Sequence, residues 1–158
     1  MNWMRWMCLG ILAGGVAAAA FGSGGGSAQD EIELFNKQYV EMHLRMDTAA
    51  ILATWAEDGV DLMPGVAPMI GKKAIVAWVE NIVAQMQGYK VVKEEIEFHN
   101  IVISGDWASE WATEHQVVKP PGQEPVIESR GKMAMVLHRE ANGEWKVEQE
   151  MWNRAPKP

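Results

Sequence analysis

The sequence predicts a single α+β domain in which three N-terminal helices pack on a curved antiparallel sheet. Two patterns indicate this class: apolar residues at helical spacing in the first half of the chain, and β-type alternation in the second half. Turn sequences at Gly105-Asp106, Pro120-Pro121-Gly122 and Asn142-Gly143 divide the second half into long strands joined as a meander. Helices that precede a meander favour helix-on-sheet packing over a βαβ parallel sheet. The 158 residues suit one domain with its own core.

Three helices are predicted from apolar spacing and from signals at their ends. The first runs from Asp30 to Arg45, where apolar residues recur every three or four positions. A second, short helix begins at the N-cap signal Asp47-Thr48 and ends near 57–59. The third opens at Gly71 and is stopped by Gly88, since glycine is typical of a helix C-terminus.

Five strands are predicted. A short strand at Val60–Met63 lies between the second and third helices, and a Pro-Gly turn follows it. The four long strands span 91–104, 107–119, 126–139 and 145–153. Because side chains alternate between the two faces of a strand, the facing of these four strands decides which residues reach the interior.

The first 28 residues have the layout of a signal peptide. Arg5 is their only charged residue, the apolar run Trp6–Phe21 follows it, and small residues occupy 22–28. We therefore expect export to the periplasm or the extracellular space. An uncleaved membrane anchor is the alternative interpretation, although a stable span needs about 20 strongly apolar residues.

Cleavage is expected near Ala28-Gln29, with a cut after Ala20 as the alternative. The mature domain would then span 29–158 and have no membrane contact. Cys8 is the only cysteine and lies in the removed segment, so the mature domain would hold no disulfide.

Composition limits the partners of the chain. Its formal net charge is −7, and an acidic protein argues against a nucleic-acid partner, whose phosphates require clustered Lys and Arg. Eight Trp and eleven Met favour wide, adaptable apolar surfaces, which suit either a pocket wall or ordinary core packing. The His residues show no HxH or HExxH spacing, and we expect neither a metal ion nor a cofactor.

Several motifs follow one another in an order known from one superfamily. They are DTAAILATWAEDGV at 47–60, IGKKAI at 70–75, GDWA at 105–108, RGK at 130–132, and GEWK at 143–146 leading to MWN at 151–153. In this order they resemble the SnoaL-like, ketosteroid-isomerase-like domains of the nuclear-transport-factor-two-like superfamily. The resemblance covers about 31–153, and the closing strand pair is its most specific part.

The resemblance implies a cone of three helices against a bent sheet, with a deep pocket at the open end and frequent dimerisation through the sheet. Members include isomerases, cyclases, dehydratases and non-catalytic binding domains, so the fold alone does not define the function.

The catalytic pattern of the isomerases is only partly present. Aligning helix to helix without a gap places the isomerase Tyr on Tyr39 but places the catalytic carboxylate on Met63, which cannot accept a proton. The second acid would fall near 133–135, where no carboxylate stands. Asp61 lies two residues before Met63 and therefore on the same face of its strand, so it could serve as a displaced base. An exposed Asp at a strand end is the alternative interpretation.

Two His residues are further candidates. His43 lies one helical turn after Tyr39, so both side chains share one helix face. On the second long strand, the more apolar alternating set is predicted to face inward: Trp107, Ser109, Trp111, Thr113, His115 and Val117. His115 would then join Tyr39, either as a base or as a hydrogen-bonded core histidine.

On the last strand, alternation predicts that Val147, Gln149, Met151 and Asn153 face inward. Gln149 and Asn153 would then be polar groups able to orient a ligand. Capping of the strand end is the alternative role for Asn153.

These patterns lead to three functional hypotheses. The first is an exported protein that binds a small, mostly apolar organic molecule in its pocket and forms a homodimer. The second is an isomerase, cyclase or dehydratase acting on a polyketide-like or steroid-like carbonyl compound, with catalytic residues Asp61, His115 and Tyr39. The third is a dimeric protein-interaction domain with a filled cone. The predicted pocket-lining residues are Tyr39, His43, Trp55, Asp61, Met63, Trp111, Thr113, His115, Gln149 and Asn153.

Overall fold

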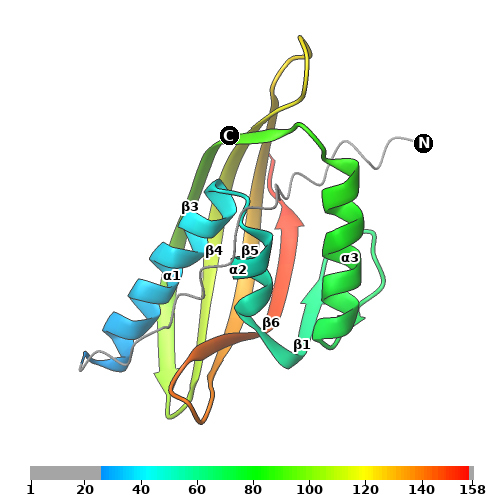
Figure 1. Ribbon diagram of the computed structural model, residues 1–158. Helices are drawn as coiled ribbons and strands as arrows, with labels where there is room; N and C mark the ends of the chain where they lie inside the picture. Colours follow the sequence, from blue (N-terminus) through cyan, green and yellow to red (C-terminus); the bar gives the residue numbers. More distant parts are fainter. Residues whose placement is uncertain (1–25, 157–158) are drawn as a thin grey trace.

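Three helices cover one face of a six-stranded sheet in the computed structural model of the chain, which describes residues 26–156 (Figure 1). The predicted α+β class with a curved sheet is confirmed, and the sheet is mostly antiparallel. We call the helix-covered face of the sheet the inner face and the opposite one the outer face.

The elements are α1 (Ala28–Leu44), α2 (Thr48–Ala53), β1 (Trp55–Leu62), β2 (Met69–Ile70), α3 (Lys72–Gln85), β3 (Lys90–Ser104), β4 (Trp107–Lys119), β5 (Ile127–Arg139) and β6 (Trp145–Arg154).

The strand order is β2-β1-β6-β5-β4-β3. The four long strands form the predicted antiparallel meander. The prediction of an antiparallel sheet fails at one strand pair, because β1 pairs with β6 in parallel. The two strands stand far apart in sequence, and no hairpin dictates their relative direction. The short strand β2, which was not predicted, pairs antiparallel with β1 at the sheet edge.

Helix α1 begins two residues earlier than predicted because Ser27 caps it. The Ser27 side chain accepts a hydrogen bond from the backbone N–H of Asp30, and the Asp30 carboxylate accepts one from the backbone N–H of Ser27. The predicted apolar stripe through Ile32, Phe35 and Tyr39 is buried. Asn36 and His43 lie on the same buried face, so α1 carries polar groups toward the sheet.

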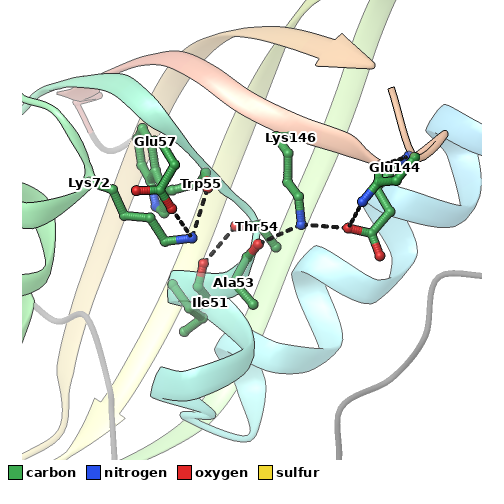
Figure 2. A network of polar contacts seen from close by, with 9 residues as sticks. Ile51, Ala53, Thr54, Trp55, Glu57, Lys72, Glu144 and Lys146 are labelled. Carbon is green, nitrogen blue, oxygen red and sulfur yellow. Dashed lines mark hydrogen bonds and ion pairs between the residues drawn. The ribbon is translucent and has the colours of Figure 1, made fainter. Parts of the chain in front are cut away.

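The second helix is shorter than predicted, because the chain becomes strand β1 at Trp55. At the end of α2 and just after it, the carbonyl groups accept hydrogen bonds from neighbouring elements rather than from a further helical turn (Figure 2). The Lys146 ammonium donates to the Ala53 carbonyl at 2.9 Å, and the backbone N–H of Val147 donates to the Thr54 carbonyl at 2.8 Å. Lys72 donates in the same way to the Trp55 carbonyl at 3.1 Å. These contacts start the β1–β6 pairing and place β1 beside β6.

Helix α3 ends before Gly88, as predicted, and Gly88 has a φ of +83°. Its buried residues Ile75, Val79 and Ile82 pack toward β1 and β2, whereas α1 packs toward β3. No helix among residues 26–156 is long and apolar enough to cross a membrane.

The facing of strand β4 is the reverse of the prediction. Ala108 and Ala112 are buried on the inner face, whereas Trp107 and Trp111 are 46% and 45% exposed on the outer face. Helix packing explains the difference, because small side chains let a helix approach the sheet closely. The large apolar side chains of the strand then lie on the outer face. A prediction that places the more apolar face inside therefore assigns the wrong face of β4 to the interior.

The facing of strand β6 changes within the strand. Val147 pairs with Leu137 and Gln149 pairs with Val136, which leaves Glu148 as an extra residue in a β-bulge. Val147 faces inward as predicted, but beyond the bulge the inward residue is Glu150, and Gln149 is exposed.

Candidate functional site

Five carboxyl groups lie on the inner face, and we call these residues the acid cluster. They are Asp61 of β1, Glu94 of β3, Glu110 and Glu114 of β4, and Glu150 of β6. Four of them are only 4–8% exposed, and Glu114 is half-buried. Burial disfavours the charged form of a carboxyl group, and it raises the pKa of all five.

Asp61, Glu150 and Tyr39 form the part of the cluster nearest the β1 edge. Asp61 and Glu150 are register neighbours across the parallel strand pair. The Tyr39 hydroxyl donates a hydrogen bond to Glu150 Oε2 at 2.8 Å. Burial raises the pKa of Asp61 to about 7. Burial, with added repulsion from Asp61, raises the pKa of Glu150 to about 8. At neutral pH this pair therefore holds about one proton between its two carboxyl groups.

Trp152 reaches Glu114 across the intervening strand β5. Its indole Nε1 donates a hydrogen bond to Glu114 Oε2 at 2.6 Å. On β5 the residue opposite Glu114 is Gly131, and a Cβ added there would clash with the indole ring of Trp152. The glycine thus leaves the space through which a β6 side chain holds a β4 carboxylate.

Glu94 lies beside Glu114 and completes the cluster toward β3. Gln116 Nε2 donates a hydrogen bond to Glu94 Oε2 at 2.6 Å. Burial, with added repulsion from Glu114, raises the pKa of Glu94 to about 9. A hydrogen bond between the two acids raises the pKa of Glu94 and lowers that of Glu114, so the Glu94 carboxyl is the donor. Glu94 is therefore protonated at neutral pH.

Glu110 is held from the helix layer. Asn36 Nδ2, one turn before Tyr39 on α1, donates a hydrogen bond to Glu110 Oε2 at 2.7 Å. Burial raises the pKa of Glu110 to about 7. Helix α1 thus supplies a separate donor to each of two acids, Asn36 to Glu110 and Tyr39 to Glu150.

His43 is a buried neutral histidine. Its Nδ1 lies 2.8 Å from the Tyr39 carbonyl, which can only accept, so Nδ1 carries the proton. Burial lowers the pKa of His43 to about 4. Its ring packs on the Tyr39 ring with centroids 4.2 Å apart. His43 therefore positions Tyr39 and remains uncharged at neutral pH.

Half of the predicted lining residues lie inside. Tyr39, His43, Trp55, Asp61 and Met63 are all buried, and Asp61 and Met63 share a face as predicted. Tyr39 and Asp61 come together around Glu150. Trp55 and Met63 belong to the apolar core that surrounds the cluster.

The other half do not face inward, and this part of the prediction is wrong. Trp111, Thr113 and His115 alternate with the inward acids of β4 and lie on the outer face. His115 contacts two acids of neighbouring strands there, Glu128 at 2.8 Å and Glu95 at 3.5 Å. Gln149 and Asn153 are exposed because the bulge at Glu148 reverses the alternation.

Sequence reasoning missed Glu94, Glu110, Glu114 and Glu150. It expected the second acid near 133–135 on β5, but the structure supplies one from β6, since Glu150 pairs with Met135. One available signal was the series Ala108, Glu110, Ala112 and Glu114 at alternate positions of β4. Small residues at alternate positions are typical of a strand face under a closely packed helix.

The cluster is not arranged as a metal site. Within residues 26–156, no group of three or more His, Cys, Asp or Glu side chains is placed to hold a metal ion. The arrangement offers three buried carboxyl groups with pKa values near neutrality, those of Asp61, Glu110 and Glu150. Such pKa values are typical of acid–base sites and of charged-ligand sites.

Solved structures with the same fold are numerous. A ketosteroid isomerase-like protein from Erwinia carotovora atroseptica superposes with a TM-score of 0.68 at 20% identity, covering 80% of this chain and 95% of that one. A conserved protein from Planctomyces limnophilus gives 0.66 at 24% identity, covering 80% and 98%. A candidate dehydratase of the NTF2-like (nuclear-transport-factor-two-like) family from Streptomyces avermitilis gives 0.68 at 18%, covering 82% and 97%.

At these identities the similarity shows the fold, which is the one that the resemblance implied. A search of curated protein sequences finds no significant match. The profile of the SnoaL-like domain matches residues 36–148, from Asn36 on α1 to the bulge of β6, which is most of the described chain. This chain therefore belongs to the SnoaL-like domain family.

Proposed function

We propose that the protein binds a small organic molecule on the inner face and transfers protons on it, as an isomerase or dehydratase would. The observation that carries this proposal is the Asp61–Glu150 pair. Asp61 is 4% exposed, its Oδ1 has no hydrogen-bond partner among the described residues, and burial raises its pKa to about 7. A carboxylate with a free oxygen and a pKa near neutrality is suited to act as a general base.

Glu150 supplies the complementary acid. At neutral pH it is largely protonated, and Tyr39 fixes its position. In an isomerisation, Asp61 takes a proton from a carbon next to a carbonyl group while the Glu150 O–H hydrogen-bonds to the carbonyl oxygen, where negative charge develops. Asp61 then returns the proton to another carbon of the conjugated system, and both carboxyl groups regain their starting states. Tyr39 acts through Glu150 rather than directly on the carbonyl.

Binding without turnover is the second candidate. It is supported by the Glu94–Glu114 pair, which lies on the β3 side of the cluster and has no role in the proton transfer above. A binding protein would use all five acids to recognise its ligand, and Asp61 would then be one contact among several.

The test is solvent deuterium incorporation into a panel of cyclic and aryl ketones, followed by NMR in deuterated buffer. This readout detects proton abstraction from carbon even where no product accumulates. We expect Asp61→Asn to reduce incorporation by about a hundredfold or more. Asp58→Asn, on an exposed position of the same strand, is the matched control and should leave the rate unchanged. Equal incorporation by the wild type and Asp61→Asn would refute the catalytic role.

We also propose that the protein is a homodimer formed through the outer face. Trp111, Ala134 and Met151 are register neighbours across β4, β5 and β6, and they form an exposed apolar row. Trp111 and Met151 are 45% and 46% exposed, and Trp107 adds a further exposed indole on β4. An apolar row of this kind is typical of an interface.

Export is likewise proposed from the sequence pattern. The predicted leader comprises residues 1–28. Its first 25 residues, which include the apolar run, lie outside the described residues. The remaining residues 26–28 are described, and Ser27 caps helix α1. Fractionation of the native host tests this proposal, and we expect the protein outside the cytoplasm.

A further inference from the structure

Hydrogen bonding within the acid cluster leaves more acceptors than donors. Four side-chain donors reach the cluster, and each one serves a different acid: Tyr39 serves Glu150, Asn36 serves Glu110, Gln116 serves Glu94 and Trp152 serves Glu114. Asp61 receives none of these four.

At the cluster, three buried oxygens remain without a partner among the described residues. They are Asp61 Oδ1, Glu110 Oε1 and Asn36 Oδ1. Their residues are only 4–5% exposed, so water does not readily serve them. Each of the four donor side chains already serves another oxygen, so a ligand with N–H or O–H donors of its own is suited to bond to these oxygens.

Six ion pairs join a lysine or an arginine to an acid outside the cluster. These acids are Glu31, Glu41, Glu57, Glu95, Glu128 and Glu144. The four side chains that donate to the cluster are uncharged, so none of them neutralises the negative charge of an ionised acid there.

Aromatic rings lie next to these acids. Tyr39 meets Phe98 edge to face with centroids 6.3 Å apart, and the half-buried Trp152 bonds to Glu114. Aromatic faces attract organic cations, and they pack equally well against the apolar part of such a molecule. Acids with free oxygens beside aromatic rings are the chemistry that recognises a protonated amine.

We propose that the ligand of this site is an organic cation, a protonated amine on an apolar group, whose N–H groups bond to the free oxygens of the acid cluster. This proposal rests on the proposed function only in that a small molecule enters the inner face. It does not require turnover, and it adds a positive charge to the small, mostly apolar ligand that the sequence led us to expect.

Binding should be linked to proton release. The titratable groups that face the cluster are Tyr39 and His43 from α1 and the five acids from β1, β3, β4 and β6. Strand β5 presents Gly131, Met133 and Met135 to this face, and the buried residues of α3 are apolar.

His43 stays neutral and Tyr39 stays protonated near neutral pH, since burial lowers the pKa of His43 and raises that of Tyr39. The carboxyl groups are left to titrate, and an ammonium ion displaces their protons.

The experiment is isothermal titration of the full chain with phenethylammonium and butylammonium, each compared with its alcohol. We expect at least one ammonium ion to bind about tenfold or more tightly than the alcohol of the same shape. Affinity should rise about tenfold or more between about pH 6 and about pH 8.5, and buffers of different ionisation enthalpy should report proton release. Equal affinity of each alcohol and its ammonium ion, or an affinity independent of pH, would overturn the proposal.

Two variants locate the binding. Glu114→Gln keeps an acceptor for Trp152 and removes the charge, and it should weaken ammonium binding about tenfold. Asp61→Asn should do the same if Glu114→Gln does not fold, and circular dichroism checks the fold of both. Glu97→Gln, an exposed position on β3, is the control and should bind as the wild type does. Undiminished binding by folded Glu114→Gln and Asp61→Asn would contradict the proposed site.

The two proposals fail in different ways. Ammonium binding without deuterium exchange into any ketone supports the cation site and refutes catalysis. Deuterium exchange into neutral ketones without preference for an ammonium group supports catalysis and refutes the cation site.

Discussion

Glu94→Gln should raise the stability of the protein at alkaline pH while leaving it nearly unchanged at acid pH. Protonated Glu94 accepts a hydrogen bond from Gln116 and donates one to Glu114. A glutamine offers the same pair, an acceptor oxygen and a donor N–H group, so it imitates the protonated acid without its charge.

The sign follows from the pKa of Glu94, which burial raises from 4.5 to about 9. The folded state holds the proton more tightly than the unfolded state does. The resulting stabilisation is fully present below about pH 4.5, and it is lost as the pH rises through about 9. The glutamine variant has no proton to lose at this position, so its stability should not follow that decline.

The magnitude is set by the span between these two pKa values. At about 1.4 kcal/mol per pH unit, the full span gives an upper limit of about 6 kcal/mol. Because Glu94 is coupled to Glu114 and solvation of the ionised pair would lower its cost, we expect about half of this limit. A gain of about 3 kcal/mol corresponds to a rise in Tm of about 10 °C for a domain of this size.

The assay is urea unfolding of the wild type and Glu94→Gln, followed by tryptophan fluorescence at about pH 5.5 and about pH 9. Glu97→Gln is the matched control on the exposed side of the same strand, and it should track the wild type at both pH values. If Glu94→Gln loses as much free energy of unfolding between the two pH values as the wild type does, the protonated Glu94 does not stabilise the fold.

Three further predictions concern the surroundings of the cluster. Gly131→Ala should cost about 1–3 kcal/mol in the free energy of unfolding, because its Cβ would clash with the indole of Trp152; urea unfolding measures the loss. Trp111→Ser should shift the protein from dimer to monomer in analytical ultracentrifugation, and an unchanged sedimentation coefficient would contradict the proposed interface. Ser27→Ala should destabilise the exported protein by about 1 kcal/mol if cleavage follows Ala20, whereas a cut before Gln29 would remove the cap; mass spectrometry of the exported form distinguishes the two.

The order of the elements was readable from the sequence because it depends on local signals. Apolar spacing located α1 and α3, and turn residues such as Gly105 and Gly143, both with positive φ, fixed the joints of the meander. The start of β1 was missed, because the apolar spacing through Trp55 predicts a continued helix. Contacts from Lys146 and Val147, which lie about ninety residues further along the chain, end the helix there. Long-range pairing of this kind leaves no local trace.

The candidate site was only half predictable for the same reason. Tyr39 and Asp61 were found because each depends on the periodicity of its own element. Glu110 and Glu114 were assigned to the wrong face, because the assumption that the more apolar face of β4 lies inside fails when the outer face is itself apolar. Trp107 and Trp111 misled the assignment, and their exposure supports the proposed interface rather than a pocket.

Glu150 depends on one residue of register. The bulge at Glu148 places Glu150 on the inner face, where it meets the Tyr39 hydroxyl and stands beside Asp61. Without the extra residue, Gln149 would face inward in its place, and the Tyr39 hydroxyl would have no carboxylate to hold. Because a bulge preserves every residue type and changes only the phase of the alternation, strand periodicity cannot reveal it. The bulge therefore belongs to the candidate site as much as the side chains do, since it makes Glu150 the neighbour of Asp61 rather than a solvent-exposed acid.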